Sequence, residues 1–285
     1  MIYMNSHMMA SGLLREHFAR EFQPIHDAEE LRLSIGRQPY VITGDSEYRL
    51  HGIFTSDDML FALERATGAS IRTAASRITQ GYINYNGLRV GVCGTGTYER
   101  DKLTGLNEFT SLDIRLSHEC IGICDDIKCR IYGKNLLIIS QPGGGKTTAL
   151  REIVRILSEQ GTRVGLVDER GEIAAMTNGT AQFDVGIRTD VLTGIEKSRA
   201  ALMLLRGMSP QIIAMDEITK AEDTSAVLDI IGCGVGIIAT AHAKSTDDLK
   251  KRAVYRELLE QRVFDSLLII SGQGKERRYL LENIA

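Results

Sequence analysis

The stretch that decides the fold is LLIISQPGGGKTTALREIVRILSEQG, residues 136–161 of the 285-residue chain. Four apolar residues open it, a loop with consecutive glycines follows, and an amphipathic stretch runs on to Gly161. Such a loop can surround a triphosphate with backbone N–H donors, because glycines leave room where a Cβ atom would collide with the phosphates. The helix that follows directs its positive amino end at the same point. The segment therefore predicts a strand at 136–139, a phosphate-binding loop and a helix at 146–160.

The residues around the glycines have the spacing that a nucleotide with its metal needs. Lys146 is expected to reach the outer phosphates, and the Thr147 hydroxyl is expected to hold Mg²⁺. Ser140 stands where the usual pattern, G-x-x-x-x-G-K-[ST], has its first glycine, and the glycines further along keep the phosphate side of the loop open. The predicted ligands are ATP and Mg²⁺. The predicted nucleotide-binding residues in this loop are Pro142, Gly143, Gly144, Gly145, Lys146, Thr147 and Thr148.

Short apolar runs alternate with amphipathic stretches in the rest of the carboxy-terminal half. The runs 164–167, 212–215 and 236–239 are typical of buried strands, and helices are expected at 195–205 and 221–231. This alternation predicts an α/β fold, a parallel sheet with helices on both faces. Ligands of such sheets lie at the carboxyl ends of the strands.

Acidic residues follow two of the predicted strands. Asp216 can reach the Mg²⁺ shell beside Thr147, and Glu217 can polarise an attacking water. Asp168 and Glu169 follow the neighbouring strand in the same way. Glu169 is therefore a second candidate for orienting the water, and the sequence does not separate it from Glu217.

A histidine and an arginine complete the predicted catalytic set. His242 follows another apolar run and is expected to sense the γ-phosphate. Arg188 lies in DVGIRTDVL, residues 184–192, and could stabilise charge that develops on phosphate or act on a neighbouring subunit. An ordinary surface ion pair with Asp184 or Asp190 explains Arg188 equally well.

The amino-terminal part of the sequence follows a different pattern. Alternating apolar and polar residues after Glu29 predict a small antiparallel sheet, and Thr55 or Ser56 begins a helix. Asn86-Gly87 is a strong hairpin signal. Further expected elements are a helix at 70–79, a loop at Gly94–Thr97 and a strand at 109–116.

These patterns predict two domains joined by a linker. We expect an amino-terminal extension at 1–28, an α+β domain at 29–118, a linker at 119–134 and the P-loop ATPase domain at 135–285. The chain is long enough for each domain to bury a core of its own.

Composition narrows the partners and the compartment. The formal net charge is -3, the pI is about 6.1 and no basic run stands out, so no nucleic-acid partner is expected. No apolar stretch is long enough to span a bilayer and no leader is evident, which predicts a cytoplasmic protein without direct membrane insertion. Five cysteines without a framework are read as reduced thiols. A zinc site at His118, Cys120, Cys124 and Cys129 is the weaker interpretation, because no paired C-x-x-C is present.

Five spaced motifs, PGGGKTT, LVDERGEIA, DVGIRTDVL, LLRGMSPQIIAMDEI and ATAHAKSTDDL, together resemble the stage III sporulation protein AA family. That family is related to the type II and type IV secretion ATPases, and the resemblance covers roughly residues 29–285. It implies a RecA-like P-loop ATPase domain of the AAA+ type behind a smaller amino-terminal domain, assembled as a homo-oligomeric, hexameric ring.

The resemblance also implies roles for particular residues. The family's phosphate loop matches 143–148, its magnesium-side acid matches Asp216 and its His box matches His242. The acidic box of the secretion relatives resembles Asp168-Glu169. Arg115 matches the amino-terminal arginines that close over the nucleotide in those relatives.

The expected activity is hydrolysis of ATP coupled to domain movement. The resemblance places this motor on the cytoplasmic side of a mother cell–forespore channel, with contact to the membrane through membrane-embedded channel or secretion components. One alternative is a nucleotide-gated scaffold that seldom turns ATP over. Another is a DNA-stimulated RecA-like ATPase, which the near-neutral pI disfavours.

Overall fold

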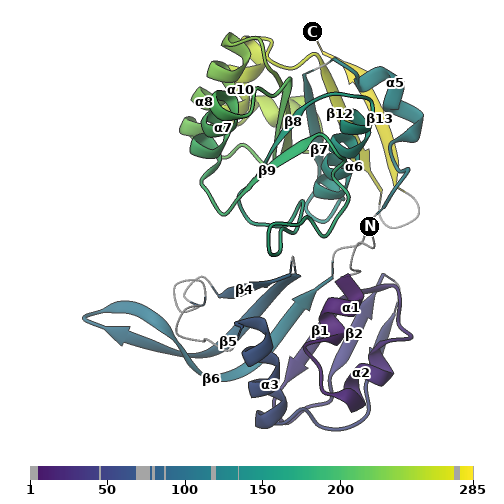
Figure 1. Cartoon of the computed structure of the whole chain (residues 1–285), viewed down its shortest axis with the longest axis vertical. Helices are drawn as coiled ribbons and strands as arrows, with labels where there is room; N and C mark the ends of the chain where they lie inside the picture. Colours follow the sequence, from purple (N-terminus) through teal and green to yellow (C-terminus); the bar gives the residue numbers. More distant parts are fainter. Residues whose placement is uncertain are drawn as a thin grey trace. The chain divides into compact units, whose positions relative to one another are not determined.

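The computed structural model describes residues 6–44, 46–68, 78, 81–86, 88–116, 120–133, 135–272 and 277–284. The chain divides into two compact units. The first contains residues 1–118 and 177–182, and the second contains residues 119–176 and 183–285. Figure 1 labels the elements of both.

The second unit is built on a seven-stranded sheet in the order β13-β12-β7-β11-β10-β8-β9. All neighbouring strands are parallel except β12 and β13, which are antiparallel. The strands are β7 (Leu136–Ser140), β8 (Val164–Asp168), β9 (Thr189–Thr193), β10 (Ile212–Met215), β11 (Gly236–His242), β12 (Ser266–Ser271) and β13 (Arg278–Asn283).

Helices cover both faces of this sheet (Figure 1). One core lies between the sheet and α7, α8 and α10, and α6 packs apart from that core against β7, β8, β9 and β11. The helical segments of the unit are η1 (Asp125–Ile127), α5 (Lys128–Ile131), α6 (Lys146–Glu159), α7 (Lys197–Gly207), α8 (Ala221–Gly232), α9 (Thr246–Lys250) and α10 (Ala253–Glu260). The parallel sheet between helical layers is the arrangement that the alternating pattern predicted.

The first unit is an antiparallel sheet with helices on one face. Its strand order is β3-β2-β1-β6-β5-β4. The strands are β1 (Ala28–Ser34), β2 (Tyr40–Thr43), β3 (Glu47–Arg49), β4 (Tyr82–Tyr85), β5 (Leu88–Glu99) and β6 (Lys102–Arg115), and the helices are α1 (Ser6–Ser11), α2 (Glu16–Phe22) and α3 (Ser56–Ala66). Thr55 caps α3 through a reciprocal pair of bonds with Asp58, which decides between the two predicted start residues, Thr55 and Ser56.

The residues expected to form an extension are part of the first unit's core. Leu13, Phe18 and Phe22 are almost fully buried against the sheet residues of this unit. The apolar spacing in this segment is therefore that of helices packed on a sheet. The residues expected to form the linker also pack, because Ile127 and Ile131 are buried in the second unit.

The predicted loop at Gly94–Thr97 was wrong, because these residues continue β5. They pair with β6 in a long hairpin that extends beyond the rest of the sheet (Figure 1). A Cβ atom at Gly94 would lie 2.5 Å from the Asn107 carbonyl oxygen, so the glycine marks a close approach of two strands. The strand predicted at 109–116 is the last part of β6. Apart from Ile78, the helix predicted at 70–79 lies outside the described residues.

Within the described ranges, the structure contains no helix with the length and apolar character to cross a bilayer. The five cysteines are free. His118, one member of the alternative zinc site, lies outside the described residues.

Candidate nucleotide site

The loop between β7 and α6 has the backbone that a phosphate-binding loop requires. Gly143 and Gly145 have φ angles of 73° and 92°, a region that side chains disfavour, and α6 begins directly after Gly145. Gly144 lies against Ser140, where a Cβ atom would be 2.7 Å from the Ser140 Cβ. Ser140 also donates from Oγ to the Gln141 carbonyl at 2.8 Å. The loop therefore accommodates Ser140 only because residue 144 is a glycine.

Lys146 is held inside the site by His242. Only 7% of Lys146 is exposed, and its Nζ lies 2.8 Å from His242 Nδ1. Because an ammonium group only donates, Nδ1 is the acceptor in this pair. Burial lowers the pKa of Lys146, against the opposing effect of the charges on Asp216 and Glu217.

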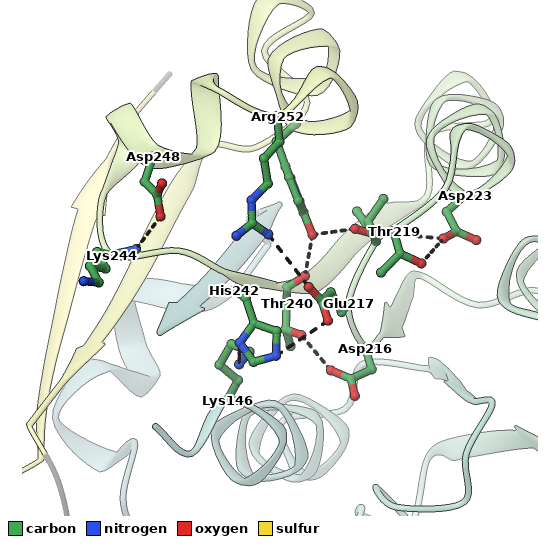
Figure 2. A network of polar contacts seen from close by, with 12 residues as sticks. Lys146, Asp216, Glu217, Thr219, Asp223, Thr240, His242, Lys244, Asp248 and Arg252 are labelled. Atoms are coloured by element: carbon green, nitrogen blue, oxygen red, sulfur yellow. Dashed lines mark hydrogen bonds and ion pairs between the residues drawn. The ribbon is translucent and has the colours of Figure 1, made fainter. Parts of the chain in front are cut away.

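The ends of β10 and β11 bring three further predicted residues, Asp216, Glu217 and His242, together beside Lys146 (Figure 2). The Thr240 hydroxyl donates to Asp216 Oδ1 at 2.6 Å, and His242 Nε2 lies 3.6 Å from Glu217 Oε2. Lys146, His242 and Glu217 therefore form a continuous polar chain across the carboxyl edge of the sheet. Its order follows from the parallel register, in which β11 lies between β7 and β10.

Lys197, at the start of α7, connects the two acidic strand ends. Its buried Nζ donates to the Glu217 carbonyl oxygen at 2.7 Å and lies 3.4 Å from Glu169 Oε2. Glu169 thus has a lysine partner at its carboxylate, whereas the Glu217 carboxylate faces His242. The structure brings Glu169 near the site but places it beside Lys197.

Asp168 is turned into the protein. It is 1% exposed, and its carboxylate accepts backbone N–H bonds from Glu172, Ile173 and Ala174 at 2.9 to 3.2 Å. Burial raises the pKa of Asp168, although these bonds act in the opposite direction. Arg151 holds the same turn by donating to the carbonyls of Ile173 and Glu172. Asp168 organises the turn after β8 and does not face the loop that carries Lys146.

Arg188 is not brought together with the other predicted residues. Val164 and Thr189 begin β8 and β9 in register, and the Arg188 carbonyl accepts from the Val164 N–H at 3.0 Å. Arg188 therefore lies at the amino edge of the sheet, opposite the phosphate loop. Its side chain is exposed.

Arg115 belongs to the first unit. It ends β6, its side chain is largely exposed, and its Nε lies 3.6 Å from Asp113 Oδ2. Its role toward a nucleotide stays a prediction.

Four site residues were missed by sequence reasoning. Lys197 contacts Glu217, Arg252 lies 4.0 Å from that carboxylate, and Tyr255 hydrogen-bonds to the same strand ends. Arg277, just before β13, reaches the carbonyl oxygen of Gly143 at 3.5 Å. None follows an apolar strand or carries a motif, so only tertiary structure identifies them.

The donors near the loop suit a magnesium ion. Thr147 offers a hydroxyl on the first turn of α6, and Asp216 offers a carboxylate of which Oδ1 accepts from Thr240. Such hard oxygen ligands are typical of Mg²⁺, which takes few protein ligands and completes its shell with phosphates and water. Among the described residues there is no cluster of three His, Cys, Asp or Glu side chains that could hold a metal on its own.

Comparison with known proteins identifies relatives of this chain over most of its length. Residues 5–280 match the family described as "Sporulation stage III, protein AA". The chain is 35% identical over 255 residues to stage III sporulation protein AA of Bacillus subtilis (strain 168), across 86% of this chain and 83% of the relative.

Two solved structures are similar in fold. The Legionella pneumophila ATPase DotB has a TM-score of 0.60 at 13% identity, covering 92% of this chain and 77% of DotB. The pilus retraction motor PilT with bound ADP has a TM-score of 0.60 at 13% identity, covering 90% of this chain and 79% of PilT. At this identity the likeness shows the fold, and it confirms the predicted RecA-like α/β class.

Proposed function

Because the chain belongs to the sporulation stage III, protein AA family, we propose that it binds ATP with Mg²⁺ and hydrolyses ATP as the motor of a sporulation complex. One observation carries this proposal: Lys146, His242 and Glu217 form a connected chain beside a loop with phosphate-binding backbone geometry. A site with a buried lysine and acidic residues at the ends of neighbouring strands is suited to binding a triphosphate and to phosphoryl transfer.

The proposed reaction is the transfer of the γ-phosphoryl group of ATP to water. The water oxygen bonds to the γ-phosphorus, the bond to the ADP oxygen breaks, and Glu217 accepts the proton of the water. Lys146 stabilises negative charge on the phosphates. Bound at Thr147 and Asp216, Mg²⁺ would supply positive charge between the phosphates.

The contacts favour Glu217 over Glu169 as the residue that orients water. The Glu169 carboxylate is engaged in an ion pair with the buried Lys197 ammonium, 3.4 Å away. The Glu217 carboxylate lies beside His242, which contacts Lys146. Glu217 is therefore the acid connected to the predicted phosphate site.

His242 is proposed to report on the γ-phosphate through Lys146. In this structure Lys146 donates to His242, and a phosphate oxygen would compete for the same ammonium group. Release of His242 would then alter its contact with Glu217, 3.6 Å away. Nucleotide binding would in this way change contacts at the ends of β10 and β11, the strands that precede α8 and α9.

The proposed assembly is a homo-oligomeric ring, a hexamer by family resemblance, that drives membrane-embedded channel components from the cytoplasmic side. Arg188 lies at the sheet edge opposite its own phosphate loop, so any action of Arg188 on phosphate requires a second copy of the chain. Arg115 is the proposed nucleotide contact from the first unit. Sizing the protein with and without ATP and Mg²⁺ tests the assembly, and a monomer under both conditions would contradict it.

Phosphate release by the wild-type protein and the Glu217→Gln variant tests the proposed activity. Loss of a general base typically slows turnover about 100-fold or more, so Glu217→Gln should release phosphate far more slowly while still binding ATP. Glu222→Gln is the matched control, because Glu222 is an exposed acid in the first turn of α8.

Absence of turnover in both the wild-type and Glu217→Gln proteins would favour the nucleotide-gated scaffold. Turnover that rises only when DNA is added at low salt would favour the DNA-stimulated ATPase.

A further inference from the structure

The amino end of α10 directs two unassigned side chains toward the site. Arg252 is the residue before the helix, and Tyr255 follows three residues later on the same side. Arg252 points from this end toward Glu217 (Figure 2). Neither residue belongs to the motifs that identified the phosphate site.

Tyr255 anchors α10 to the two strand ends. It is 2% exposed, and its hydroxyl lies 2.7 Å from the Ile218 carbonyl oxygen and 3.2 Å from that of Thr240. The β10–β11 ladder ends at the pair Met215 and Ala239, so Tyr255 bridges the segments beyond it. Burial raises the pKa of Tyr255, which keeps the hydroxyl protonated as a donor. The distance between α10 and these strand ends is thereby fixed.

Each oxygen of the Glu217 carboxylate faces a different neighbour, Arg252 on one side and His242 on the other. Arg252 Nη1 is 4.0 Å from Oε1, and His242 Nε2 is 3.6 Å from Oε2. Both distances are too long for hydrogen bonds. Arg252 and His242 therefore attract the two oxygens without using them as hydrogen-bond acceptors. A water can therefore still bind to the carboxylate.

We propose that Arg252 is a positioning residue, anchored through Tyr255, that holds the Glu217 carboxylate in the orientation needed to bind the attacking water. The inference rests on the proposed ATPase function and adds a residue to it. It differs from a phosphate-binding role, because Arg252 would act on turnover and not on nucleotide affinity.

Steady-state phosphate release and calorimetric binding of a non-hydrolysable ATP analogue separate these roles. Arg252→Ala should lower kcat about tenfold to 100-fold, the usual effect of losing a group that orients a catalytic residue, with little change in analogue affinity. Arg252→Lys should recover part of kcat, because it keeps the charge. Lys251→Ala is the matched control: it removes the adjacent, exposed charge and should leave kcat unchanged.

A double-mutant cycle tests whether Arg252 acts through Glu217. Because Arg252→Ala can only disturb a carboxylate that is present, it should cause no further loss in a Glu217→Gln background. Tyr255→Phe, which keeps the ring and removes the hydroxyl, should reduce kcat with analogue affinity retained. The inference would be overturned if the kcat losses of Arg252→Ala and Glu217→Gln multiplied in the double variant, or if Arg252→Ala bound the analogue more weakly. Either result would leave the ATPase function intact. No turnover by the wild-type protein would overturn both.

Discussion

At the scale of single residues, the glycine at 144 makes room for the side chain of Ser140 in the phosphate loop. A side chain at 144 would meet the Ser140 side chain and the Gln141 carbonyl oxygen, the latter at 3.0 Å. We predict that Gly144→Ala weakens ATP binding at least about tenfold, because the loop must move to admit the methyl group. Ser140→Gly alone should leave affinity within about twofold.

The double variant Ser140→Gly, Gly144→Ala provides the control for this pair. It removes the serine that the new methyl group would meet, so it should regain most of the lost affinity in a calorimetric titration with ATP. A double variant that binds ATP as poorly as Gly144→Ala would show that the strain has another origin.

The positions of individual residues were predictable where a short motif fixes the spacing. Lys146 and Thr147 follow from the loop pattern, and Asp216 follows from its place after an apolar strand. Lys197 and Arg252 were not predictable, because each reaches Glu217 from a distant element. A lysine or arginine near a helix start is normally solvated, and no local pattern marks these two as exceptions.

At the scale of elements, the two acidic strand ends show how similar sequences receive different roles. Asp168 and Asp216 each follow an apolar strand, yet Asp168 binds the backbone of its own turn while Asp216 accepts from Thr240. The residues after Asp168 account for its role, because the chain turns back and brings the N–H groups of residues 172–174 to the Asp168 carboxylate. Strand position alone therefore predicts where an acid lies along the sheet and not which way it points.

The polar face of the first unit's sheet contains a pair of interacting carboxyl groups. Asp113 on β6 is opposite Arg32 on β1, and Glu30 is opposite Arg115. Burial and a hydrogen bond to Glu30 raise the pKa of Asp113 to about 6. Burial acts to raise the pKa of Glu30, but hydrogen bonds from Asp113 and Arg32 outweigh burial and lower this pKa. The pair is therefore most stable when Asp113 carries the shared proton.

This pair predicts a pH-dependent effect of Asp113→Asn. Because the folded pKa of about 6 exceeds the ordinary 3.8, protonated Asp113 stabilises the unit below pH 3.8, and that contribution is lost as the pH rises through about 6. Asparagine keeps the donor to Glu30 without ionising. The variant should therefore melt about 2 to 4 °C above the wild-type protein at about pH 7.5, with the difference shrinking toward about pH 4.5.

Thermal unfolding followed by circular dichroism at both pH values measures this difference. Asp101→Asn, an exposed change at the tip of the β5–β6 hairpin, is the control and should show no such trend. A melting difference that is the same at both pH values would contradict the shared proton.

At the scale of the whole molecule, the alternating pattern predicted the centre of the parallel sheet but not its edges. β7, β8, β10 and β11 are buried apolar runs, which periodicity detects. β9 and β13 are partly exposed edge strands with mixed composition, so their pairing is decided by the strands beside them. β12 is apolar and buried, but only its pairing with β7 and β13 distinguishes it from a helix segment.

The placement of Arg188 is also a property of the whole fold. Its loop is rigid, since Gly186 packs on Ser158 and the Arg188 N–H donates to Ser158 Oγ at 2.7 Å. The same loop exposes 92% of Ile187. A role on phosphate was one prediction for Arg188, but the parallel register places Arg188 at the edge of the sheet opposite its own phosphate loop. The sequence could not reveal this position, because the mixed composition of residues 189–193 does not identify them as β9.

Calorimetric titration of the full chain with ATP and Mg²⁺ measures whether the loop ending at Lys146 binds ATP. The wild-type protein and Lys102→Ala, an exposed control in the first unit, should both give measurable heat of binding, and Lys146→Ala should lose at least about 100-fold in affinity. No heat of binding for the wild-type protein, or unchanged binding by Lys146→Ala, would contradict ATP binding by this loop.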